Sequence, residues 1–136
     1  MIDYETDIFN DIVTEFRQVY PASEVEVASE TVKKPAFLPF VSIEEIGNYS
    51  DLGTMDQDNG DRVAVITYDV NVYTNDITGK KSRAKAILDV IDRSFVKRNF
   101  RRVQRDIVPN LADATVYRIL GRYRAKVDED GKLYRR

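Results

Sequence analysis

The feature that most constrains the fold is a pair of long segments in which apolar and polar side chains alternate. In residues 63–73, one face carries Ala64, Ile66, Tyr68, Val70 and Val72. In residues 115–127, one face carries Tyr117, Ile119, Tyr123, Ala125 and Val127, and the other carries Arg118, Arg122, Arg124 and Lys126. Because successive side chains of a strand point to opposite faces, each segment is expected to form a strand with one buried face. Gly121 interrupts the second apolar face, which predicts a β-bulge there.

Two other segments have the spacing of amphipathic helices. The apolar residues of segment 4–20 are Ile8, Ile12, Val13, Phe16, Val19 and Tyr20, and those of segment 80–97 are Ala84, Ile87, Leu88, Ile91 and Phe95. Apolar side chains that recur every three or four residues lie on one face of a helix. Pro21 is expected to end the first helix.

Shorter segments complete the predicted order of elements. Residues 25–27, 40–46 and 101–108 read as strands, residues 47–61 as a long acidic loop, and residues 128–136 as a turn and a basic tail. Segregated strands with two helices predict an α+β fold. We expect one domain over residues 1–136, in which a mixed or mainly antiparallel sheet of four to five strands has both helices on one face. The other face is then partly polar, with Asp69, Asn71, Arg118, Arg122 and Arg124.

The net charge of −2 conceals an uneven distribution. Residues 1–61 have 14 acidic and 3 basic side chains, a net charge of 3 − 14 = −11, and residues 62–136 have 9 acidic and 18 basic ones, a net charge of 18 − 9 = +9. Such blocks either neutralise one another within one fold or lie on different faces and make the molecule a dipole. Identical dipoles favour head-to-tail contacts of the kind that form rings and filaments.

The composition removes many enzyme mechanisms, because the chain contains no Cys, no His and no Trp. A thiol nucleophile, a disulfide, a thiolate metal site and a histidine base are therefore absent. The start of the chain is acidic, unlike a secretory signal, and no apolar run approaches the ~20 residues that span a bilayer. We expect no membrane association.

Two loops resemble ligand-binding motifs but do not match them. Gly79 and Lys80 follow a strand and open a helix, yet a phosphate-binding loop needs Gly where Thr74 stands and Ser or Thr where Lys81 stands. Counted from Asp56, a calcium loop needs Gly at the sixth position and Glu at the twelfth. These positions hold Asp61 and Thr67. An ordinary helix start and a solvated acidic turn are the better interpretations, and we expect no metal or cofactor.

Two groups of charged side chains remain. Asp89 and Asp92 are three residues apart on the second helix, where ion pairs with the nearby Lys85 and Arg93 explain them better than acid–base catalysis does. The stretch 97–105 is the most basic of the chain. With the arginines of the last strand it could form a nucleic-acid patch, but it contains no known reader motif. A solvated face or a protein interface is the favoured interpretation.

The second half of the chain resembles a known family. The residues that carry the resemblance are Tyr68–Asn75 running into Gly79–Ala84, then Ile91-Asp92, Asn99–Arg102, Ala114–Arg118, Arg122–Ala125 and the ending Leu133–Arg136. Together they resemble the tail terminator, or tail-to-head joining, proteins of long-tailed bacteriophages, which include the lambda-like tail terminators. The resemblance covers about residues 60–136, and the first helix fits the same order of elements.

The resemblance implies a structural virion protein without enzymatic activity at the tail–neck junction, assembled in the host cytoplasm. In that family a small α+β subunit forms a hexameric ring that caps the tail tube, ends its polymerisation and docks on the head connector. DNA passes through the lumen of the ring without sequence-specific binding. The expected partners are thus further copies of the chain, the tail tube protein and a connector or head-completion protein.

The uneven charge suggests which residues meet those partners. The acidic candidates are Asp51, Asp56, Asp58 and Asp61; the basic candidates are Lys97, Arg98, Arg101, Arg102 and Arg105, with Arg118, Arg122 and Arg124 on the last strand. Complementary charge would fix the register of ring closure more than it would raise affinity. Three alternatives stay open: another neck or tail component, such as a head-completion or tail-tube subunit; a nucleic-acid-binding module; and an enzyme that uses carboxylates.

Overall fold

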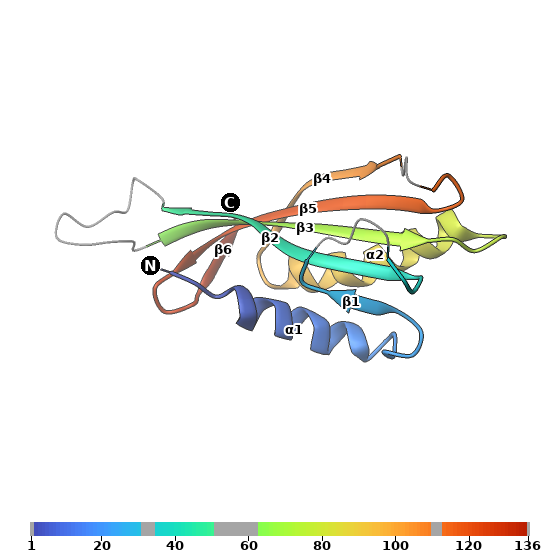
Figure 1. Cartoon of the computed structure of the whole chain (residues 1–136). Helices are drawn as coiled ribbons and strands as arrows, with labels where there is room; N and C mark the ends of the chain where they lie inside the picture. The colour runs from blue at the N-terminus through green and yellow to red at the C-terminus, as the bar shows by residue number, and fades with distance from the viewer. Residues whose placement is uncertain (1, 31–34, 51–62, 110–112, 136) are drawn as a thin grey trace.

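The chain folds around one mixed sheet. A computed structural model describes residues 2–30, 35–50, 63–109 and 113–135. The elements are α1 (Glu5–Arg17), β1 (Glu26–Ala28), β2 (Phe40–Ser50), β3 (Val63–Thr74), α2 (Lys80–Lys97), β4 (Arg101–Ile107), β5 (Tyr117–Asp128) and β6 (Leu133–Arg135). The sheet order is β1-β2-β3-β5-β4, and β6 also pairs with β5. Figure 1 shows both helices on the same side of this sheet, so the predicted α+β class is confirmed.

The two alternating segments become the centre of the sheet. β3 and β5 pair antiparallel over twelve residues, from Val63 opposite Asp128 to Thr74 opposite Tyr117. β2 pairs antiparallel with the other side of β3, whereas β1 runs parallel to β2. The expectation that this segment has only one buried face is wrong for β3, because all of its residues except Val63 and Asp69 are buried.

The hydrophobic core lies between the helices and the inner face of the sheet, the face that carries Tyr68. The helices contribute Ile8, Ile12, Phe16, Ala84, Ile87, Leu88, Ile91 and Phe95 to it. At its centre the ring of Phe95 stacks on that of Tyr123 at 4.7 Å between centroids, and Phe100 meets Phe95 edge-on at 4.9 Å. Aromatic pairs in these geometries add about 0.5–1.5 kcal/mol each beyond the area that they bury.

Both helices form where the spacing predicts them. α2 has the expected bounds, and α1 ends at Arg17, before Val19 and Pro21. Asn99 follows α2 with a φ of 68°. Asn tolerates this left-handed conformation better than most residues, and it reverses the chain into β4.

Three further local predictions are wrong. Residues 47–50 are not part of the acidic loop, because they continue β2 after a register shift between Glu45 and Gly47. Residues 133–135 are not a free tail, because β6 pairs with Ala125–Val127 of β5. With β6 the sheet has six strands, which is roughly consistent with the expected four to five.

The third concerns Gly121, which marks no bulge. It pairs in register with Val70 on one side and with Arg105 on the other. A Cβ atom at this position would lie 3.1 Å from the Tyr123 ring and 3.2 Å from Leu88 Cδ1. Glycine therefore allows the close packing of α2 on β5.

Candidate functional site

The structure divides the predicted basic residues among three places. Lys97 and Arg98 lie at the end of α2, in the helical layer, and Arg102 and Arg105 lie on β4 and face α2. Arg101, Arg118, Arg122 and Arg124 lie on the outer face of the sheet, opposite the helices. The basic stretch of the sequence is therefore not one continuous surface.

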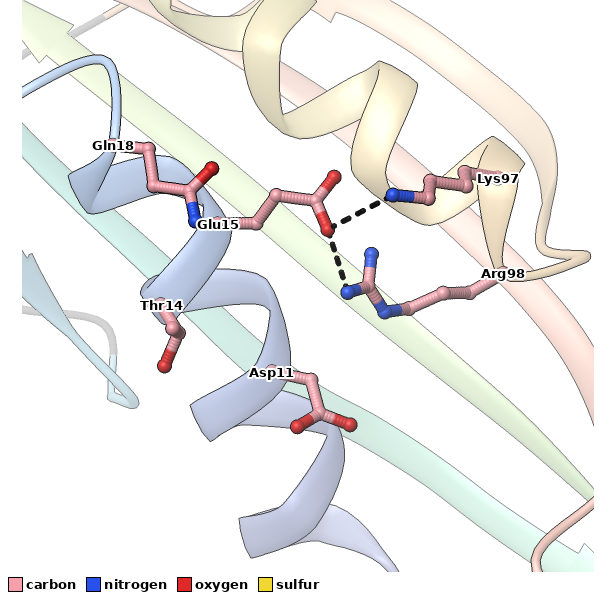
Figure 2. A pocket seen from close by; sticks show the side chains of 6 residues that line it. All are labelled: Asp11, Thr14, Glu15, Gln18, Lys97 and Arg98. Atoms are coloured by element: carbon pink, nitrogen blue, oxygen red, sulfur yellow. Dashed lines mark hydrogen bonds and ion pairs between the residues drawn. The ribbon is translucent and has the colours of Figure 1, made fainter.

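The end of α2 is joined to α1 through Glu15. Its Oε2 atom lies 2.6 Å from Nη2 of Arg98 and 3.6 Å from Nζ of Lys97 (Figure 2). The hydrogen bond from Arg98 holds the pKa of the Glu15 carboxyl below its usual value. Arg98 also donates to the carbonyl and the hydroxyl oxygen of Ser94. These contacts attach the acidic first helix to the basic second half of the chain.

A pocket of about 380 Å³ surrounds this ion pair. All of its lining residues are polar: Asp11, Thr14, Glu15, Gln18, Lys97 and Arg98 (Figure 2). Small-molecule sites are mostly apolar with a few polar groups. The pocket lacks that apolar lining, and its two cations already have a carboxylate partner, so it fits a structural ion pair better than a ligand site.

The arginines of β4 pair with the two carboxylates of α2. Arg102 lies 3.0 Å from Asp92, and Arg105 lies 3.2 Å from Asp89. The expectation of ion pairs at these carboxylates is confirmed, but the partners come from β4 and not from the same helix. The buried hydroxyl of Tyr123 donates to Asp92 as well, and burial together with this contact raises the pKa of the phenol.

The arginines of β5 reach across to β3 on the outer face. Arg122 donates to both carboxylate oxygens of Asp69, at 2.7 and 3.0 Å. Arg118 donates to the Asn71 side chain at 2.9 Å, and Arg124 donates to the hydroxyl of Thr67 at 3.2 Å. The predicted polar face is confirmed, and its arginines contribute to the pairing of the two central strands.

The acidic candidates and Arg101 complete the set of predicted interface residues. Asp51, Asp56, Asp58 and Asp61 lie outside the residues that the structure describes. Arg101 is exposed on the outer face, where its Cα partner is Arg124, and no ion pair joins it to any described residue. Arg101 is therefore the predicted interface residue most available to a partner.

The sequence interpretation missed a second group of carboxylates. Oxygens of Asp3, Glu5 and Glu45 lie within 4.8 Å of one another on the helical side of the sheet. The strict alternation of β2 already places Glu45 on the same face as Val41 and Ile43, which is an unusual position for an acid. Asp3 and Glu5 suit the start of a helix, so their spacing does not distinguish them from ordinary N-terminal acids.

No protein-family model matches the chain, and no curated protein matches it either. Within the described ranges, neither helix has the length and apolar character needed to cross a membrane.

Proposed function

We propose that the chain is a structural ring subunit of a phage tail, in which it ends the tail tube and joins the tail to the head connector. The resemblance over residues 60–136 suggests the family, and one structural observation supports a subunit interface. All residues of β4 are exposed except Gln104, which is half-buried. β4 is the outermost strand in the sheet order, so its outer backbone groups face no further strand of the described residues.

The side chains of this edge favour a specific contact. Val103 and Ile107 are 44% and 56% exposed. Of the three arginines on this strand, Arg102 and Arg105 are paired with α2, which leaves Arg101 as the basic residue of the edge. The opposite edge of the sheet, at β1, has the exposed acids Glu24, Glu26 and Glu30 in and beside it. A basic edge that meets an acidic edge of the next copy makes a heterologous contact, and such contacts close into rings when the rotation between copies permits.

The outer face supports a protein interface over a nucleic-acid interface. Nucleic-acid sites concentrate positive charge, because affinity depends on neutralising phosphates. On the outer face Asp69 lies opposite Arg122. The neighbouring arginines of β5 donate hydrogen bonds to neutral side chains of β3, Arg118 to Asn71 and Arg124 to Thr67. This face thus mixes both signs of charge.

Native mass measurement of the oligomer tests the proposal, and the variant Arg101→Glu tests whether β4 lies in the subunit interface. Arg101 is the better target for charge reversal than Arg102, because Arg102 is already paired with Asp92 inside the subunit. We expect a discrete ring, of hexamer mass, for the wild-type chain, and a shift toward monomer in Arg101→Glu. Lys85→Glu, at an exposed position of α2, makes the same change of charge away from the edge and should leave the ring intact.

Other outcomes identify the alternatives. A species that polymerises without limit indicates a tail-tube subunit, and a monomer that binds DNA in a salt-dependent manner indicates a nucleic-acid-binding module. A hexamer that Arg101→Glu and Lys85→Glu leave equally stable would support the ring but remove β4 from its interface.

A further inference from the structure

The acidic group beside α1 combines high charge density with an absence of counter-charge. Asp3 and Glu5 come from the start of the helical segment, and Glu45 comes from β2, where the register shifts. Their oxygens lie within 4.8 Å of one another, and no ion pair joins any of the three to a Lys or Arg in the described ranges. Three like charges this close repel strongly unless something compensates them.

A buried hydroxyl points to the same place independently. Tyr68 is the cross-strand partner of Glu45, on the same face of the sheet, and its side chain is fully buried. Its hydroxyl has no hydrogen-bond partner among the described residues, and the nearby charges of all three carboxylates add to the effect of burial in raising the pKa of the phenol. One oxygen of Glu45, Oε1, is likewise buried and unpartnered. Buried polar groups of native proteins normally have a partner, so these two oxygens need one.

The geometry fits an ion that takes oxygen ligands. Calcium binds oxygens at about 2.3–2.6 Å, so two ligands of one calcium ion lie at most about 5 Å apart. The separation of up to 4.8 Å satisfies this limit for all three carboxylates. A divalent cation compensates two of the three negative charges, and a water bound to it provides a partner for the tyrosine hydroxyl. A proton on one carboxylate relieves only part of the repulsion.

We propose that Asp3, Glu5 and Glu45 form a binding site for a hard divalent cation, with calcium the best-fitting probe, and that Tyr68 closes the buried side of the site. Because the ligands come from both the helical segment and β2, the ion would attach the N-terminal segment to the sheet. This site is distinct from the calcium-like loop over residues 56–67, and the sequence pattern did not predict it.

Thermal unfolding with added calcium tests the site. Weak calcium sites in proteins have Kd values of about 0.1–1 mM. At 10 mM calcium and a Kd of about 1 mM, linkage raises the ratio of folded to unfolded protein about elevenfold, which is a rise of about 5 °C in Tm for a chain of this size. Glu45→Gln keeps the shape of the side chain and removes its charge, so we expect the calcium-dependent rise to disappear in this variant. Its Tm in EDTA should equal or exceed that of the wild type, because an unfavourable buried charge is gone.

Glu44→Gln is the matched control. It removes one charge from the adjacent residue, whose Cα partner Asp69 places it on the outer face. We expect calcium to raise the Tm of Glu44→Gln as it raises that of the wild type. Terbium luminescence sensitised by tyrosine gives a direct binding readout, and calcium should displace the terbium from the wild type but find none bound in Glu45→Gln. An equal calcium response in wild type and Glu45→Gln would overturn the proposal by placing the ion elsewhere, and no response in the wild type would overturn it as well.

Discussion

The ion pair between Arg122 and Asp69 should stabilise the fold well beyond the contribution of an ordinary surface pair. The two residues are Cα partners at the centre of the sheet, and both carboxylate oxygens accept hydrogen bonds, at 2.7 and 3.0 Å. The side chain of Asp69 is only 16% exposed, and that of Arg122 is 33% exposed. Exposed ion pairs contribute about 0.2–1 kcal/mol, and hydrogen bonds to charged groups about 1.5–3 kcal/mol. After discounting for the exposed part of Arg122, we expect a coupling energy of about 1.5 kcal/mol.

A double-mutant cycle with Arg122→Ala and Asp69→Ala measures this coupling through urea unfolding. The cycle of Arg124 and Thr67 is the matched control, because it joins the same two strands through one hydrogen bond to a neutral hydroxyl. We expect about 0.5 kcal/mol for the control. Salt at 1 M should reduce the first coupling only slightly, since partly buried charges are poorly screened. A coupling of the Arg122–Asp69 pair no larger than that of the control would refute the reasoning and leave Arg122 available to a partner.

Two further changes test the packing of the helices. Gly121→Ala should lower the free energy of unfolding by about 1–3 kcal/mol, because its Cβ atom would press on Leu88 at 3.2 Å, whereas Gly47→Ala meets nothing closer than 3.7 Å and should change it little. Chemical denaturation compares the two variants. For Glu15, the hydrogen bond from Arg98 lowers the folded-state pKa, so its stabilisation is present above the unfolded pKa and is lost as the pH falls through the folded value. Glu15→Gln should therefore be less stable than the wild type at pH 7, and the difference should shrink as the pH falls below about 4.3, the ordinary pKa of Glu; a difference that stays constant as the pH falls would contradict the assignment.

The elements that the sequence predicts well are those in which local pattern and tertiary burial agree. α2 has an apolar stripe along its full length, and β5 alternates on both sides of Gly121, so the buried faces of these two elements follow from the sequence alone. β3 forms where the alternation predicts a strand, but its outer-face residues Val65, Asn71 and Tyr73 are buried as well. The end of β2 and the whole of β6 lack such a pattern. Residues 47–50 are strand because β3 pairs with them, and residues 133–135 are strand because β5 does. Pairing between distant segments is not visible in local spacing.

The basic surface shows why the site is harder to predict than the fold. Strict alternation places Arg102 and Arg105, three residues apart, on opposite faces of β4. The register shift between Arg102 and Gln104 turns both toward α2, where Asp89 and Asp92 are also three residues apart. One bulge thus converts two candidate interface residues into intramolecular ion pairs. The sequence contains the charges and the spacing, but the position of the bulge depends on how β4 pairs with β5.

The ion pairs described above bear on the uneven charge of the chain, with a net charge of −11 over residues 1–61 and +9 over residues 62–136. Glu15 pairs with Lys97 and Arg98, and Glu24 with Arg83, so part of the opposite charge is neutralised within the subunit. Other arginines take their carboxylates from their own half, as Arg122 does with Asp69. Three carboxylates of the acidic half converge beside Tyr68, and no ion pair joins them to a Lys or Arg of the described residues.

We expect the two groups of unpaired acids to bind different partners, one a cation and the other a basic surface. The cluster near Tyr68 is compact enough for an ion, whereas Glu26 and Glu30 are exposed in and beside the edge strand β1, across the sheet from the exposed Arg101. The carboxylate cluster near Tyr68 and the exposed acids at β1 should consequently respond to different perturbations. Calcium should stabilise the isolated subunit and leave ring assembly unchanged, whereas reversal of Arg101 should weaken assembly and leave the stability of the subunit unchanged.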